Sequence, residues 1–169
     1  MSYVRHPAAA DAFDLAALKL HARVDHDDDD DALELMGRTA VTEVETYCEN
    51  ALLTQTIEMI VEASGEPIPL PVGPLAPDAG VTVAGVPVLD AVTAGRYPIL
   101  TIPDTITGLV LVTYQAGYGD AVADIPADLS YAVLDHASRL YDLRGASDGK
   151  QGLSIAAARI CARHRRIRP

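Results

Sequence analysis

The sequence has few of the residues that build aromatic or cysteine-based sites. It contains no tryptophan, one phenylalanine and two cysteines, Cys48 and Cys161. The cysteines lie far apart and form no CxxC pair, which argues against a zinc site or a disulfide framework. We expect reduced, partly buried thiols, and a core of alanine, leucine, valine and isoleucine that offers few rings for stacking bases or sugars.

Long apolar runs are also absent. No run approaches the roughly 20 residues that a membrane-spanning helix needs. The N-terminus, MSYVRHPAAADAFD, lacks the continuous apolar core of a secretory signal. We therefore expect no membrane partner, and assembly in a cytoplasm. With 169 residues, 49% of them apolar and 22% charged, the chain has the size of one globular domain.

Positive charge is scarce except at one end of the chain. The formal net charge is −11. Because the last eleven residues hold five arginines and no acidic residue, the remainder carries −16. Such an acidic body repels nucleic acid phosphates at short range, which argues against a free-standing DNA-binding protein. We therefore expect the basic end to bind another partner, or to bind nucleic acid only at one restricted position.

Three segments have the apolar periodicity of helices. They span about residues 11–24, 30–50 and 126–143. Apolar residues recur in each at intervals of three or four positions, which is typical of helices with one buried face. Pro126 suits a first helical turn, and Gly145 is expected to end the third helix.

Between the second and third helices, the pattern changes to that of strands. Apolar and polar residues alternate from Leu53 to Ala63, as in a half-buried strand. A connection rich in proline follows and cannot lie in a central strand. Short strand candidates complete a β region over residues 52–114: 81–83, 86–92, 97–102 and 108–114.

The order of these elements predicts an α+β fold. We expect a small helical bundle with an inserted small antiparallel β-sheet or meander, and an extended basic C-terminal tail. Residues 1–145 would form the body, and residues 146–169 a flexible hinge and a docking tail. A short helix could form over residues 153–163. No βαβ alternation occurs, so a doubly wound nucleotide-binding fold is not expected.

Several segments resemble, in their order along the chain, the head–tail connector (adaptor) proteins of tailed phages, including the equivalent protein of gene transfer agents. The segments are LAALKLHARVD at 15–25, VETYCENALLTQT at 44–56, LPVGPL at 70–75, VTYQAGYG at 112–119 followed by IPADL at 125–129, and RHRRIR at 163–168.

The resemblance implies a structural subunit of a virion or phage-like particle, with no enzymatic activity and no cofactor. Such subunits form a ring, usually of twelve copies, below the portal protein at the head–tail junction. A head-completion (stopper) or tail-terminator protein would lie on the other side. Genomic DNA would pass through the ring without sequence-specific binding. The C-terminal segment of such proteins extends to grip the portal.

The basic tail is the first candidate site. Arginine forms bidentate contacts with carboxylates, so this tail favours docking into an acidic groove, and the resemblance makes the portal the expected partner. Direct contact with DNA phosphates and binding to another acidic partner stay as alternatives. The candidate residues are Arg159, Arg163, Arg165, Arg166, Ile167 and Arg168.

An acidic run is the second candidate site. Its residues are Asp25, His26, Asp27, Asp28, Asp29, Asp30 and Asp31. One interpretation is a solvated loop that places carboxylates at the N-terminus of the next helix. In a ring, Asp27, Asp28, Asp29, Asp30 and Asp31 could face the channel or a neighbouring subunit.

A cation site in this run is a third interpretation, and it supports the alternative function of a metal-dependent hydrolase. The run lacks the glycine and the glutamate that an EF-hand has at positions six and twelve, so we expect no metal site.

No other segment has a catalytic pattern. His136 follows Asp135 directly, and adjacent residues on a helix do not face each other, so we expect a packed or interface histidine. The serines lie in no GxSxG sequence. Gly117–Asp120 lacks the lysine and the spacing of a phosphate-binding loop and is expected to be a turn. The sequence predicts no enzymatic activity.

Overall fold

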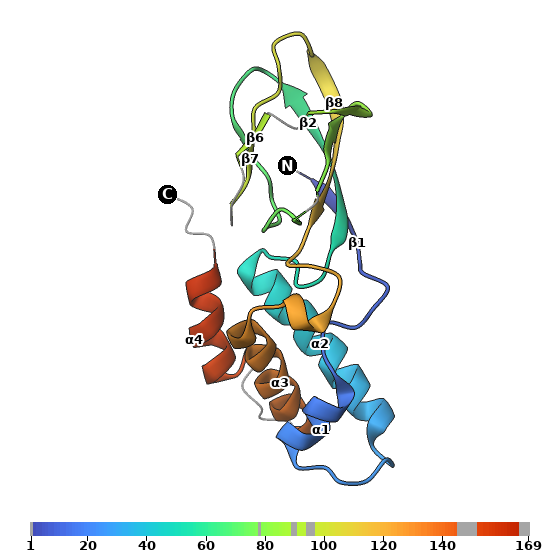
Figure 1. The fold of residues 1–169 in the computed structure, drawn as a ribbon. Helices are drawn as coiled ribbons and strands as arrows, with labels where there is room; N and C mark the ends of the chain where they lie inside the picture. The colour runs from blue at the N-terminus through green and yellow to red at the C-terminus, as the bar shows by residue number, and fades with distance from the viewer. Residues whose placement is uncertain (1, 78, 89–90, 94–96, 145–151, 166–169) are drawn as a thin grey trace. The chain divides into compact units, whose positions relative to one another are not determined.

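The computed structural model describes residues 2–77, 79–88, 91–93, 97–144 and 152–165. The chain divides into two compact units (Figure 1). The sheet unit comprises Met1–Ala9 and Glu49–Asp120, and the helical unit comprises Ala10–Cys48 and Ala121–Pro169. Each unit is thus assembled from two separate stretches of chain.

The sheet unit is built around one long antiparallel pair of strands, β2 (Gln55–Ala63) and β8 (Gly108–Ala116). The strand β1 (Tyr3–His6) pairs with β2. On the other side, β4 (Val81–Val83) pairs with β8, and β5 (Val86–Pro87) pairs with β4. The sheet therefore has the order β1-β2-β8-β4-β5.

A second, smaller sheet consists of β3 (Ile68–Pro69), β7 (Ile99–Leu100) and β6 (Val92–Thr93), in the order β3-β7-β6. Its apolar residues join the inner residues of β2 and β8 in one buried core. At the centre of this core, the Tyr114 hydroxyl donates to the carbonyl of Val72 and accepts from its N–H, both at 3.1 Å. The proline-rich connection is thereby held against the sheet.

The helical unit contains α1 (Leu15–Ala22), α2 (Asp30–Cys48), α3 (Ala127–Asp142) and α4 (Ile155–His164). A short 3-10 turn, η2 (Val122–Asp124), precedes α3. The buried residues of α2 repeat at helical spacing, as the sequence pattern predicts: Leu33, Gly37, Ala40, Val44, Glu45 and Cys48. Among the described residues, no helix has the length and apolar character to cross a membrane.

The α+β fold predicted from the sequence is confirmed. Helix α1 is shorter than expected, because Asp14 caps it by accepting a hydrogen bond from the Ala16 N–H at 2.9 Å, and Arg23 adopts a left-handed conformation at its end.

The strand β1 was not predicted. Its four residues are mostly exposed and carry no alternating pattern. Among the described residues, β5 and the start of β6 lie within the expected strand at 86–92, and β7 lies within the expected strand at 97–102.

Candidate docking site: the C-terminal helix and the acidic loop

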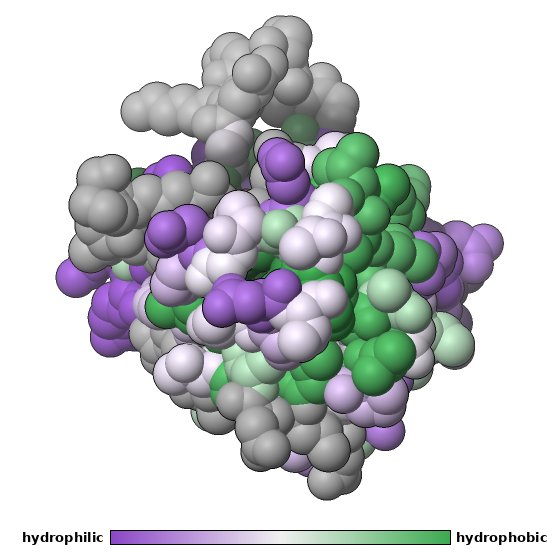
Figure 2. Space-filling model, turned by 90° about the horizontal axis from the view of Figure 1, so that it is seen from above, coloured by the Kyte–Doolittle hydropathy of each residue, from purple (hydrophilic) through white to green (hydrophobic). Residues whose placement is uncertain are grey.

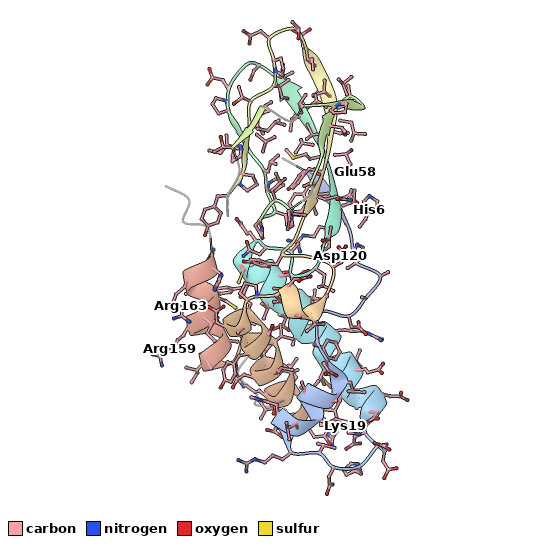
Figure 3. All side chains as sticks on the ribbon, viewed as in Figure 1. His6, Lys19, Glu58, Asp120, Arg159 and Arg163 are labelled. Carbon is pink, nitrogen blue, oxygen red and sulfur yellow. The ribbon has the colours of Figure 1, made fainter. Side chains whose placement is uncertain are left out.

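Helix α4 packs against α3 and α2 within the helical unit, and its residues Ala157, Cys161 and His164 are buried. The opposite side of α4 is exposed and presents Arg159 and Arg163, which point away from the helix in Figure 3. Two of the predicted docking arginines therefore lie on the surface of a packed helix.

The N-terminal end of α4 is held by hydrogen bonds to α3. The Ser154 hydroxyl caps the helix by accepting from the Ala157 N–H at 3.1 Å, and donates to the Asp135 carboxylate at 2.5 Å. The Ser154 N–H donates to Nδ1 of His136 at 3.2 Å. Because Nδ1 accepts this bond, Nε2 carries the proton and donates to Glu43 at 2.8 Å. His136 is thus a buried, hydrogen-bonded histidine, as expected.

The C-terminal end of α4 is held by contacts with Asp128 of α3. Nε2 of His164 lies 2.7 Å from the carboxylate of Asp128, and the Arg163 guanidinium lies 3.8 Å from it. Partial burial opposes ionisation of Asp128, but the hydrogen bond from His164 and the positive charges nearby lower its pKa below the usual value. Arg165 lies with its guanidinium 5.4 Å from the centre of the Tyr47 ring.

These contacts make α4 part of the helical core, which differs from the expectation of a tail separate from the body. Removing the chain from Arg159 onward would take Cys161 and His164 out of this core. Gly145, most of the expected hinge, and the docking residues Arg166, Ile167 and Arg168 lie outside the described residues. Arg165 is the last residue of the tail that the structure describes.

The two cysteines, far apart in the sequence, meet between α2 and α4. Both are free and buried. The Cys48 thiol lies 3.7 Å from the carbonyl oxygen of Cys161. A hydrogen bond between the two thiols lowers the pKa of Cys161 against the opposing effect of burial. They contribute to the packing of α4.

The acidic loop before α2 is held to α1 by a lysine. The Lys19 ammonium lies 2.5 Å from the Asp27 carboxylate and 2.7 Å from that of Asp30. Its hydrogen bonds to Asp27 and Asp30 raise the pKa of Lys19. The loop is therefore folded back onto α1.

The same loop is held to α3 by Asp29. The Tyr141 hydroxyl donates a hydrogen bond to this carboxylate, and the Arg144 guanidinium lies 3.3 Å from it. The hydrogen bond from Tyr141 lowers the pKa of Asp29. The guanidinium also lies 3.8 Å from the centre of the Tyr141 ring, so these three side chains form one cluster.

The carboxylates of the acidic run thus serve different partners. Asp30 and Asp31 lie in the first turn of α2, where negative charge stabilises a helix. Asp28 and Asp31 are exposed. In the part of the chain that the structure describes, no three His, Cys, Asp or Glu side chains are placed together to hold a metal ion. The loop interpretation, in which carboxylates support the helix, accounts for these contacts.

Sequence reasoning did not find the partners of the acidic loop. Lys19, Tyr141 and Arg144 have no special spacing relative to the aspartates and meet them only through the packing of α1 and α3 around the loop. The available signal is an acidic run between helices that carry cations near their ends. It does not identify which cation contacts which aspartate.

Comparison with known protein families finds a match over part of the chain. Residues 13–76 match the family described as "Phage gp6-like head-tail connector protein". No curated protein sequence matches the chain.

Solved structures match the whole chain. In a structure titled "Virion of native gene transfer agent (GTA) particle", a chain with 23% identity superposes with a TM-score of 0.78, over 100% of this chain and 97% of that chain. A chain in the "Neck of empty GTA particle computed with C6 symmetry" gives 24% identity and a TM-score of 0.79, with the same coverage. A chain in the "Neck of native GTA particle computed with C12 symmetry" gives 23% and 0.76, again over 100% and 97%. The resemblance to head–tail connector proteins is therefore confirmed, and the whole chain has the fold of chains found in gene transfer agent particles.

Proposed function

We propose that this protein is a structural head–tail connector subunit of a tailed-phage or gene-transfer-agent particle. One observation carries the proposal. The fold matches chains of such particles over the full length of this chain, while residues 13–76 match the connector family. The protein acts by joining parts of a particle at the head–tail junction and catalyses no reaction.

The subunits assemble into a ring that lines the DNA passage. The similar chains lie in necks computed with C6 and C12 symmetry, which supports a ring and favours twelve copies. The net charge of −11 suits a conduit through which DNA passes without binding. Of the acidic loop, Asp28 and Asp31 are exposed and available to the channel or to a neighbour.

The ring lies between the portal protein and a stopper or tail-terminator protein. Because α4 is packed, the segment that can extend into an acidic groove of the portal begins near Arg165 and continues with Arg166, Ile167 and Arg168. Arg159 and Arg163 can contribute only as side chains on the exposed face of α4.

A binding experiment tests this function. The purified chain is mixed with the purified portal of the same particle, and the complex is analysed by native mass spectrometry and electron microscopy. We expect a ring of this chain on one end of the portal. A chain that stays monomeric and unbound at high concentration of both proteins contradicts the proposal.

A further inference from the structure

The outer face of the sheet unit is apolar at its centre. The inner residues of β2 and β8 are buried, and the outer face of a one-sided antiparallel sheet is usually polar. Here Ile60 is 62% exposed and lies directly opposite Leu111, which is 47% exposed. Leu109, two residues before Leu111 on the same face, is 78% exposed. These three residues form an apolar patch that is left exposed by the part of the chain that the structure describes.

Acidic residues border this patch. Glu58 and Glu62 flank Ile60 on β2, and Glu62 lies opposite Leu109 in the register. Glu58 forms an ion pair with His6 at 3.3 Å (Figure 3). Figure 2 views the molecule from above and shows apolar residues gathered on one side of this face. We call Glu58, Ile60, Glu62, Leu109 and Leu111 the sheet face.

The exposed side of α4 has the opposite charge. Ile155, 80% exposed, and Arg159 and Arg163 follow one another at intervals of four residues, so they lie along one side of the helix. No acidic residue occurs in α4. We call Ile155, Arg159 and Arg163 the helix stripe. It combines an apolar residue with two arginines, as the sheet face combines apolar residues with two glutamates.

We propose that the helix stripe of one copy docks on the sheet face of the next copy. This inference rests on the ring proposed above. A ring with one subunit per repeat joins two different surfaces of the same chain, because its contacts are head-to-tail. Two sheet faces in contact would bring glutamates together, whereas the sheet face and the helix stripe are complementary in charge and both offer apolar area. Arg165 and the residues after it remain for the portal.

Charge reversal tests the pairing. The sheet variant carries Glu58→Arg and Glu62→Arg, and the stripe variant carries Arg159→Glu and Arg163→Glu. Each is expected to lose ring formation by itself, with self-association weakened about a hundredfold or more. Mixed in equal amounts, the two variants should form rings again by alternating. Every contact is then complementary in charge, because the unaltered stripe meets the unaltered sheet face and the altered stripe meets the altered sheet face. These rings should contain both variants in equal number, as measured by native mass spectrometry.

Control variants separate surface pairing from a general effect of charge. Glu66→Arg and Arg23→Glu each make one substitution of the same kind at an exposed position outside both surfaces, and both should assemble as the unchanged chain does. Circular dichroism should show that every variant is folded. In addition, Leu109→Asp should weaken ring formation without altering the fold.

The outcomes distinguish this inference from the proposed function. If the unchanged chain forms rings, alone or on the portal, but both charge-reversed variants also form them, the pairing is wrong and the connector function stands. The pairing is also wrong if the mixture of folded variants fails to assemble. If the stripe variant forms rings and only fails to bind the portal, the helix stripe faces the portal. An unchanged chain that forms no ring, either alone or with the portal, overturns both proposals.

Discussion

The imidazole of His164 lies 2.7 Å from the Asp128 carboxylate, so that the last turn of α4 is joined to the first turn of α3. His164 is buried, and Asp128 is partly exposed. The basic end of the chain is therefore fixed to the helical unit up to this point. This contact decides which part of the end can act as a docking segment.

Replacing Asp128 should lower stability in a pH-dependent way. Its pKa is lowered in the folded state, so its contribution is present above the usual carboxyl pKa of 3.8 and is lost as the pH falls through the lowered value. Asp128→Asn should cost about 0.5–1 kcal/mol at pH 7, given the partial exposure, and the difference from the unchanged chain should shrink below about pH 4. Urea denaturation at pH 7 and pH 3 measures both values. A difference that is equal at the two pH values would show that the ionised form is not what stabilises α4.

Two truncations should behave differently. Removing residues 166–169 leaves all of α4 in place, so the chain should stay folded while portal binding weakens. Removing residues 159–169 also takes away the buried Cys161 and His164 and should lower the melting temperature of the helical unit. Thermal unfolding and a portal pull-down report the two effects. Full portal binding by the shorter truncation would remove the docking role of the segment after Arg165.

The docking segment should tolerate lysine only in part. Arg165→Lys, Arg166→Lys and Arg168→Lys together keep the charge but lose the planar guanidinium that binds a carboxylate through two bonds. We expect portal affinity between those of the unchanged chain and the 166–169 truncation, measured by surface plasmon resonance. Affinity equal to that of the unchanged chain would mean that charge alone attracts the segment.

The acidic loop should not depend on a metal ion. Asp29→Ala removes the partner of Tyr141 and Arg144 and should lower the melting temperature modestly. Adding or chelating calcium and magnesium should shift neither this variant nor the unchanged chain. Metal-dependent hydrolysis that disappears in a variant with Asp28→Asn and Asp29→Asn would instead establish the alternative enzymatic function.

Gly117, in the AGYG segment that resembles the connector family, should be intolerant of a side chain. Its φ of +147° is rarely adopted by other residues, and a Cβ would lie 2.6 Å from the backbone of Leu53. Gly117→Ala should cost more than about 2 kcal/mol, because backbone cannot move aside as a side chain can. Gly85→Ala is the matched control, since Gly85 also has positive φ but no atom within 4 Å of the added Cβ. Equal losses in denaturant unfolding would mean that backbone conformation alone requires Gly117.

Local patterns were sufficient to predict the long elements of both units. The helical spacing in α2 and α3 and the alternation in β2 each record which side of the element is buried, so a single stretch of sequence contains the signal. The sequence of β1 has no pattern that shows which of its sides is buried. It pairs with β2 about fifty residues later in the chain, and its exposed residues show no alternation.

The sequence by itself determined where the long helices and strands form and where charge of each sign collects, because these depend on neighbouring residues. Only the tertiary structure decided which charges meet. Lys19 and Tyr141 reach the acidic loop, and His164 reaches Asp128, because helices distant in sequence pack together. The same packing, which buries one side of α4, separated the arginines on its exposed face from those that follow it.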